Sequence, residues 1–148
     1  MATERDPSTD EAQIRALLDE RVQAIQAKDV DTLISAAAPD VVSFDALPPL
    51  QRIGADAVRA RAEEWLGWYD GPVGYEMRDL RITAGADTAF ASYLYRVTGM
   101  MTNGSQVDMW VRSTLGLQKR NGRWTIAHEH TSVPFDAESG KAAVDLAP

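Results

Sequence analysis

The sequence predicts an α+β fold, in which helices from the first half of the chain cover one face of an antiparallel sheet built from the second half. Apolar residues recur at helical spacing before residue 70. After that point, long runs rich in β-forming residues are joined by tight turns, two of which contain the hairpin dipeptide Asn-Gly, at 103–104 and 121–122. Helices followed by a strand meander are typical of this fold class, and the sheet must bury one face against them.

Three helices are expected. The first spans about residues 10–27, with Asp10 as a suitable N-cap, and its apolar residues share one helical face: Ile14, Leu17, Leu18, Val22 and Ile25. A short second helix is expected over about 30–37. A third is expected over about 55–68, ended by Asp-Gly-Pro at 70–72.

The strands follow from β-forming runs between turn residues. A short strand is expected over 41–44, and the segment 45–54 is expected to be irregular because its two prolines lack backbone donors. Four long strands are then expected, over 75–83, 88–100, 106–119 and 123–133. We therefore expect one domain over 10–135, between loose tails at 1–9 and 136–148.

Composition limits the classes of function. The 148 residues suit one domain, and their 45% hydrophobic and 25% charged content is that of an ordinary soluble globule. A net charge of −7 opposes binding to nucleic acid or anionic membranes. No cysteine is present, which excludes disulfides, thiolate metal sites and cysteine nucleophiles. No apolar run could cross a bilayer and the N-terminus does not resemble a targeting peptide, so a cytoplasmic protein is expected.

Three local patterns carry a family resemblance over about residues 10–134. Ala27-Lys28-Asp29 lies between the first two helices, a strand-to-helix segment spans Val41 to Gly54, and a last hairpin spans Arg120 to Ser132. This order of elements resembles the nuclear-transport-factor-two-like superfamily, which includes ketosteroid isomerases, SnoaL-like polyketide cyclases, scytalone dehydratase and a kinase association domain. The resemblance implies a cone, in which a curved sheet wraps the helices around a ligand pocket. It also implies homodimers through the outer sheet face.

The resemblance gives Asp45 and Arg21 roles in that pocket. Asp45 falls on the general-base aspartate of the isomerases, and a base of this kind needs dry surroundings that raise its pKa. The plain alternative is a turn aspartate that accepts hydrogen bonds from backbone amides. Arg21 falls on the position of the isomerases' oxyanion-binding tyrosine, and its alternative is an arginine at the helix edge lying over apolar surface.

The chain also departs from the isomerases. Their second oxyanion donor is a protonated aspartic acid, kept neutral by its apolar site, and Ser113 falls at that position. With Arg21 in place of tyrosine and Ser113 in place of aspartic acid, the oxyanion hole is not reproduced. An arginine beside Asp45 suits the binding of an anion better than it suits a strong base.

Arg96 is a further candidate for the pocket. It resembles a pocket arginine of the kinase association domain, and with Arg21 it would favour a carboxylate-bearing ligand through forked hydrogen bonds. The alternative is an arginine at the rim, paired with Asp108 or Glu76.

The last strand presents His128-Glu129-His130, and alternation decides which side chains face the pocket. The resemblance puts Glu129 and Thr131 inward, as a second carboxylate near Asp45 and a ligand contact, and the histidines outward beside Trp110 and Trp124. The opposite parity would turn His128 and His130 inward as acid/base or ligand-binding groups. A His-x-His pair could hold a metal ion only with a third ligand, which the sequence does not supply, so no metal is expected.

Trp65 is expected near the mouth of the pocket, where it could stack on a flat ligand. The first functional hypothesis is therefore a SnoaL-like protein that binds a small molecule. If it is an enzyme, it would be a cofactor-free isomerase, cyclase or dehydratase. Asp45 and Glu129 would be its catalytic candidates. The second hypothesis is a non-catalytic module for oligomerisation or ligand sensing.

Overall fold

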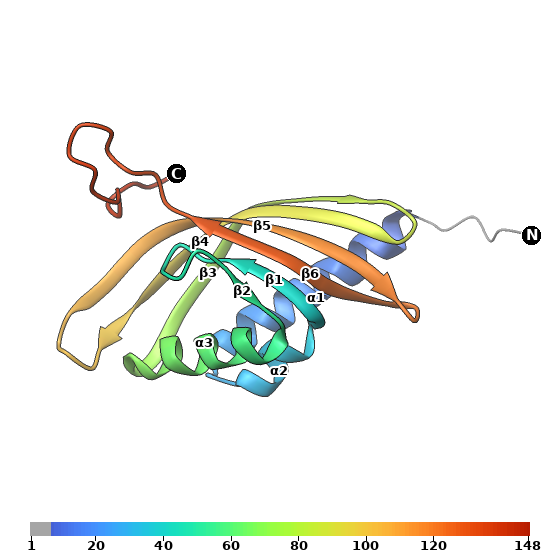
Figure 1. Cartoon of the computed structure of the whole chain (residues 1–148), viewed down its shortest axis with the longest axis horizontal. Coiled ribbons are helices and arrows are strands. Elements are labelled where there is room, and N and C mark those ends of the chain that lie inside the picture. Colours follow the sequence, from blue (N-terminus) through green and yellow to red (C-terminus); the bar gives the residue numbers. More distant parts are fainter. Residues whose placement is uncertain (1–6) are drawn as a thin grey trace, which may run out of the picture.

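The structure is a computed structural model that describes residues 7–148. Three helices lie on one side of a curved sheet of six strands, which wraps around them without closing (Figure 1). The helices are α1 (Pro7–Gln26), α2 (Val30–Ser35) and α3 (Ala55–Gly67); the strands are β1 (Ala37–Phe44), β2 (Arg52–Ile53), β3 (Tyr69–Ala84), β4 (Thr88–Met101), β5 (Gln106–Arg120) and β6 (Arg123–Ser132). The predicted α+β class and cone-like arrangement are confirmed.

The sheet has the strand order β2-β1-β6-β5-β4-β3. Strands β3 to β6 form the predicted antiparallel meander, and β1 joins it in parallel beside β6. This parallel pairing brings the end of β1 next to the end of β6, with Ser43 opposite Glu129 and Phe44 opposite His130. The residue after β1 and the end of β6 therefore meet at one edge of the cone.

A β-bulge in β6 decides which of its side chains face the helices. Leu117 pairs with Ile126, but Gly116 pairs with His128, so Ala127 is an extra residue without a partner in β5. The side-chain alternation consequently reverses at this point. Ile126 faces inward before the bulge, and Glu129 and Thr131 face inward after it, so the predicted orientation of this pair is confirmed.

The predicted outward position of Trp124 is wrong for the same reason. Trp124 is 3% exposed and belongs to a core cluster with Ile14, Leu18 and Leu117. Strict alternation cannot put both Trp124 and Glu129 on the inner face, because their positions differ by five, an odd number. The extra residue in the bulge makes this possible.

Asp10 has a different role from the predicted helix cap. Helix α1 begins at Pro7, and Asp10 lies in its first turn, 4% exposed. Its Oδ1 accepts hydrogen bonds from Lys119 Nζ at 2.9 Å and from the indole Nε1 of Trp124 at 3.1 Å. These contacts attach the start of α1 to the β5–β6 hairpin. This hairpin lies at the opposite end of β6 from Glu129.

Two boundaries differ from the prediction for local reasons. Strand β3 starts at Tyr69 and runs through Pro72, which an edge strand tolerates because it needs fewer ladder donors. The segment 45–51 is irregular as predicted, but Arg52–Ile53 pairs with β1 as strand β2. Gly54 then adopts φ +95° at the N-cap of α3 and donates its N–H to Val41 O at 2.7 Å.

The ends of the chain differ from the predicted tails. Residues 1–6 of the predicted tail lie outside the described residues, and 7–9 belong to α1. Beyond β6, residues 134–148 form an arm with its own backbone bonds, including a bridge between Phe135 and Ala142. The arm extends past the sheet on the side away from α2 and α3 (Figure 1). None of the helices described is long and apolar enough to span a membrane.

Candidate functional site

A cavity of about 200 Å³ lies between the helices and the inner face of the sheet. Its wall is mostly apolar, with side chains such as Ile25, Leu33, Val58 and Val97 contributed by α1, α2, α3 and β4. The charged groups in this wall are Arg21, Asp45, Arg52, Arg61 and Glu129. Among the described residues, the cavity therefore contains three guanidinium groups and two carboxylates inside an apolar shell.

Asp45 lies at the end of β1, where the chain leaves the sheet. Ala46 N donates to Thr131 Oγ1 at 3.0 Å, which ties this turn to β6. Leu47 N donates to Asp45 Oδ1 at 3.0 Å, an Asx-type turn. The backbone of the loop thus fixes the Asp45 carboxylate. This contact is the one expected if Asp45 were a turn aspartate, but it is only part of what holds the side chain.

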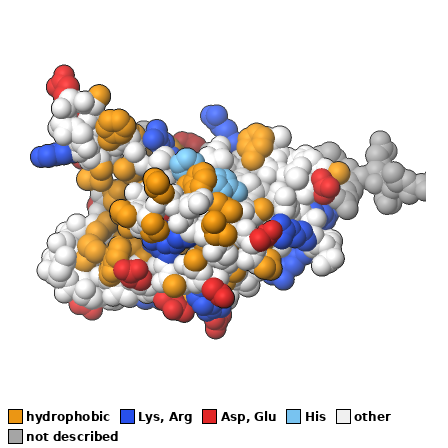
Figure 2. Space-filling model, viewed as in Figure 1, with side chains coloured by type: hydrophobic (Ala, Val, Ile, Leu, Met, Phe, Trp, Pro, Cys, Tyr) orange, Lys and Arg blue, Asp and Glu red, His pale blue; other side chains and the backbone are white. Residues whose placement is uncertain are grey.

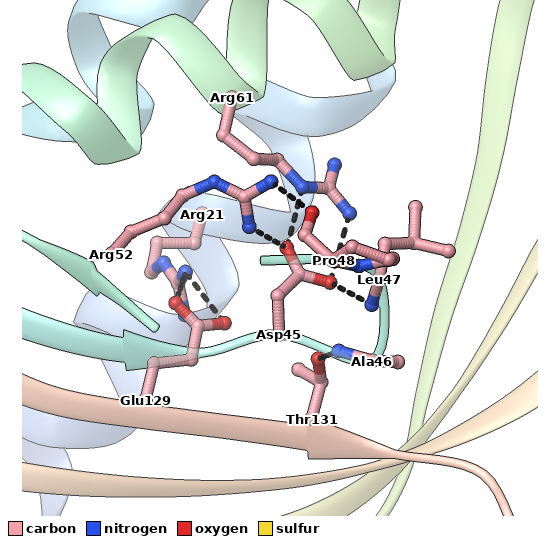
Figure 3. A network of polar contacts seen from close by, with 9 residues as sticks. All are labelled: Arg21, Asp45, Ala46, Leu47, Pro48, Arg52, Arg61, Glu129 and Thr131. Atoms are coloured by element: carbon pink, nitrogen blue, oxygen red, sulfur yellow. Dashed lines mark hydrogen bonds and ion pairs between the residues drawn. The ribbon is translucent and has the colours of Figure 1, made fainter. Parts of the chain in front are cut away.

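Two arginines supply the other contacts of Asp45 (Figure 3). Arg52 Nη1 lies 3.2 Å from Oδ2, and its Nη2 donates to Pro48 O at 2.8 Å. Arg61 donates from Nε to Oδ2 and from Nη2 to Oδ1, the latter at 3.3 Å. Each oxygen of Asp45 therefore accepts two hydrogen bonds, and its side chain is only 11% exposed.

Arg21 and Glu129 form a second ion pair in the same cavity (Figure 3). Arg21 Nη2 lies 3.2 Å from Glu129 Oε2 and 3.4 Å from Oε1. Burial, the largest single influence, acts to lower the pKa of Arg21, but the Glu129 carboxylate together with Tyr93 and Tyr75 outweighs it, and the pKa is raised above its ordinary value. The Nε atom of Arg21 is buried and has no hydrogen-bond partner among the described residues.

Tyrosine rings form the part of the wall contributed by β3 and β4. Tyr75 and Tyr95 stack with ring centroids 4.7 Å apart, and both line the cavity. Burial is the main cause that raises the pKa of each phenol above its ordinary value. Both hydroxyls therefore stay protonated at neutral pH and are hydrogen-bond donors.

Several residues predicted for the pocket line the cavity. Asp45, Arg21, Glu129, Thr131 and Trp65 all contribute to its wall. The Trp65 ring lies under the guanidinium of Arg61, 5.2 Å from the ring centroid, and packs edge-on against Tyr69. These contacts fix both side chains and make Trp65 a rigid wall.

Arg96, His130 and Ser113 do not line this cavity. Arg96 points to the outer face of the sheet and pairs with Asp108 through two contacts of 2.8 Å, which is the alternative foreseen for it. Inward positions on β4 are taken by its neighbours Tyr95 and Val97. Because strand side chains alternate, Arg96 must face outward.

The bulge in β6 turns His130 to the outer face, where its ring lies edge-on to Phe44 at 5.6 Å. Ser113 does face inward and is 3% exposed, but it is packed in the sheet beside the cavity, and its Oγ has no hydrogen-bond partner among the described residues. No group of three potential metal ligands occurs in the described part of the chain.

Arg52 and Arg61 were not among the residues predicted for the pocket. A signal existed for Arg61, which follows Val58 at helical spacing and precedes Trp65 on the same face of α3. An arginine on the apolar face of a helix must either reach solvent or meet a partner. No comparable signal marked Arg52, since its position depends on how the segment 45–53 folds back on β1.

Comparison with known proteins supports the family. The model of the SnoaL-like domain matches residues 14–136. An NTF2-like protein of unknown function from Pseudomonas putida has 36% identity, with 95% of this chain and 98% of that chain covered and a TM-score of 0.88. No curated protein matches significantly.

Two more distant structures share the fold. A ketosteroid isomerase-like protein from Erwinia carotovora has 21% identity, covers 82% of this chain and 93% of its own, and has a TM-score of 0.70. An NTF2-like superfamily protein from Salmonella enterica has 19% identity, covers 93% and 100%, and has a TM-score of 0.78. From the matched domain and the shared architecture, this chain is a member of the SnoaL-like family within the NTF2-like superfamily.

Proposed function

We propose that the protein binds a small, largely apolar molecule bearing a carboxylate, and that it transfers a proton on this molecule without a cofactor. The observation that carries the proposal is the charge inside the cavity. Three arginines face two carboxylates in an apolar wall, which leaves one positive charge in excess. A buried charge without a partner is unfavourable, and a guanidinium binds a carboxylate through forked hydrogen bonds, so an anionic ligand is the fitting counterpart.

Arg21 is the arginine best suited to hold the ligand. Arg52 and Arg61 already donate to Asp45, whereas the buried Nε of Arg21 has no partner among the described residues. We propose that Nε donates to an oxygen of the ligand. The apolar body of the ligand would lie against Trp65 and the stacked tyrosines, which suits a planar molecule.

Glu129 is a better candidate than Asp45 for the group that accepts a proton. Both oxygens of Asp45 are fully engaged, so it cannot take a proton without losing a hydrogen bond to an arginine or the loop. We assign Asp45 the role of holding Arg52 and Arg61 in place. Among the described residues, Arg21 is the only hydrogen-bond donor to Glu129, which leaves lone pairs on both of its oxygens.

The proton transfer would take place beside a carbonyl group of the ligand. Glu129 would take the proton from the carbon next to the carbonyl; the electron pair of that C–H bond would form the C=C bond of an enolate, and the π pair of the carbonyl would move to its oxygen. The cationic Arg21 next to Glu129 would stabilise the enolate. If the ligand has a C=C bond next to that carbon, the product is a dienolate, and return of the proton from Glu129 to its far carbon would shift the double bond and give an isomer.

Calorimetry with paired ligands tests the binding proposal. We expect 1-naphthoate and cinnamate to bind saturably, and their primary amides to bind at least about tenfold more weakly because they carry no charge. Arg21→Met should abolish the preference for the carboxylate, whereas Arg96→Met, which removes an arginine outside the cavity, should retain it. Equal affinity for acid and amide, or equal loss in the two variants, would contradict the proposal.

Deuterium exchange tests the proton transfer separately. With β-benzoylpropionate in D₂O, we expect the wild-type protein to accelerate deuterium uptake beside the ketone, as followed by NMR. Glu129→Gln should remove the acceleration while binding persists, and Asp45→Asn should retain part of it. Ligand binding without any acceleration would leave a carrier or sensor rather than an enzyme.

We also infer that the chain forms a homodimer through the outer face of the sheet. Phe44 and Phe90 are exposed on this face at 38% and 54%, which is unfavourable for an isolated chain. Light scattering coupled to size exclusion measures the mass directly. A monomer at micromolar concentration would contradict this inference.

A further inference from the structure

The arm formed by residues 134–148 has an ordered backbone but no core of its own. Ala143 N donates to Pro134 O at 2.7 Å, and Asp136 N donates to Lys141 O at 2.8 Å. Asp136 Oδ1 also accepts from the backbone of Glu138 at 2.8 Å. Despite this order, Phe135, Val144 and Leu146 are 70%, 47% and 52% exposed.

A second apolar surface lies on the body of the molecule, near the end of β1. It consists of four exposed side chains, named here the apolar strip: Phe44, Leu47, Leu50 and Ile53. Leu50 is 96% exposed, and the strip borders a shallow hollow that also includes His130. In Figure 2 apolar side chains gather around the two histidines on this face.

We propose that the arm of one copy docks on the apolar strip of a second copy, so that two chains exchange arms. The strip and the arm are both apolar surfaces left uncovered in a single chain, and the arm leaves the body on the outer side of the sheet (Figure 1). The inference rests on the dimer proposed above, whose interface is that same outer face. A preformed arm loses little conformational entropy on docking, which favours association.

The charges of the two surfaces are complementary. The arm carries three carboxylates, Asp136, Glu138 and Asp145, against one lysine, Lys141. The sheet face beside the strip presents the cationic Arg112, which donates to Ser132 at the root of the arm, and the imidazole rings of His128 and His130. An acidic, apolar segment therefore fits this face better than a basic one.

Arm exchange would also complete the ligand site. Leu47 belongs both to the apolar strip and to the wall of the cavity, and Asp45 borders both the cavity and the hollow. An arm seated on the strip would cover the loop 45–51 that closes the cavity on this side. Each cavity would then be closed by the partner's arm, and ligand entry would depend on the dimer.

Cross-linking tests the exchange directly, because the chain contains no cysteine and introduced cysteines are unique. Leu50→Cys and Leu146→Cys are made in separate chains, one carrying a size tag, then mixed and oxidised mildly. We expect a mixed disulfide dimer that is reversed by reductant. Asp19→Cys, on the exposed face of α1, replaces Leu50→Cys as the matched control and should give at least about tenfold less mixed dimer.

Truncation after Pro134 provides a second measurement. We expect the dissociation constant of the dimer to rise at least about tenfold, measured by analytical ultracentrifugation with circular dichroism as a check on folding. Suppose that the full-length chain is dimeric. Arm exchange is then overturned, with the dimer left intact, if no mixed disulfide forms above the control or if truncation leaves the dissociation constant unchanged. A disulfide that forms only within a doubly substituted chain places the arm on its own body and also overturns it. A monomeric full-length chain overturns both inferences.

Discussion

Asp45 and Arg61 are in direct contact in the wall of the cavity, joined by two hydrogen bonds from the guanidinium to the carboxylate (Figure 3). Arg52 adds a third contact to the same carboxylate from the other side. The aspartate that the family resemblance assigns to proton transfer is thus, in this chain, surrounded by donors.

Removing Asp45 should therefore destabilise the protein. Asp45→Ala leaves two largely buried arginines without their partner, and we expect the free energy of unfolding to fall by about 1–3 kcal/mol, less than for fully buried pairs because some solvent reaches the groups. Urea denaturation measures the change. The control is Glu11→Gln, which removes an exposed pair with Arg15 at 3.9 Å and should change stability by less than about 0.5 kcal/mol.

Removing the charge of Glu129 should strengthen the binding of anions. Glu129→Gln keeps the shape of the side chain but raises the excess positive charge of the cavity, so we expect a carboxylate ligand to bind several-fold more tightly. Calorimetry with 1-naphthoate measures this, and the naphthamide should show no such gain. A weaker affinity for the carboxylate would mean that Glu129 contacts the ligand favourably rather than competing with it for Arg21.

Two glycines should respond in opposite ways to alanine. A Cβ at Gly99 would lie 2.7 Å from the ring of buried Tyr69, so Gly99→Ala should destabilise the fold by about 1–3 kcal/mol. A Cβ at Gly67 meets nothing within 4 Å at the end of α3, so Gly67→Ala should be neutral or stabilising by up to about 1 kcal/mol. Thermal unfolding of both variants, compared with wild type, tests the assignment of Tyr69 to the core.

The buried tyrosines should make stability fall at alkaline pH. The pKa values of Tyr75 and Tyr95 are raised in the folded protein, mainly by burial, so only the unfolded chain ionises just above the ordinary phenol value of 10.0. The contribution of the buried neutral phenols to the free energy of unfolding is fully present below that pH. It is lost as pH rises above it, by up to about 1.4 kcal/mol per pH unit for each tyrosine. Chemical denaturation between pH 9 and 11.5 should show the decline, and Tyr95→Phe should reduce its slope.

The indole of Trp124 should contribute through its hydrogen bond as well as its burial. Trp124→Phe keeps an aromatic ring but removes the donor to Asp10, and we expect a loss of about 1–3 kcal/mol in the free energy of unfolding. Trp68→Phe is the control, since Trp68 is 36% exposed at the end of α3 and should tolerate the change. Equal losses in the two variants would argue against a specific role for the Asp10 contact.

The order of elements could be read from the sequence because local patterns determine it. The helical spacing around Leu18 and the turn at Asn121-Gly122 each act within a few residues, and the elements formed as predicted. Arg21 and Asp45 were assigned to the pocket through the family resemblance, which itself rests on local sequence matches. The composition of the cavity wall was therefore partly foreseeable.

The tertiary structure alone decided which charged groups meet. The extra residue at Ala127 reverses the alternation of β6, which brings Glu129 to Arg21 and buries Trp124, and a bulge of this kind depends on pairing with β5 rather than on the local sequence. The fold of the segment 45–53 likewise brings Arg52 to Asp45. Contacts between residues far apart in the chain are set by strand register and loop closure, which no periodicity encodes, and these contacts make Asp45 an anchor for arginines and leave Glu129 facing the cavity.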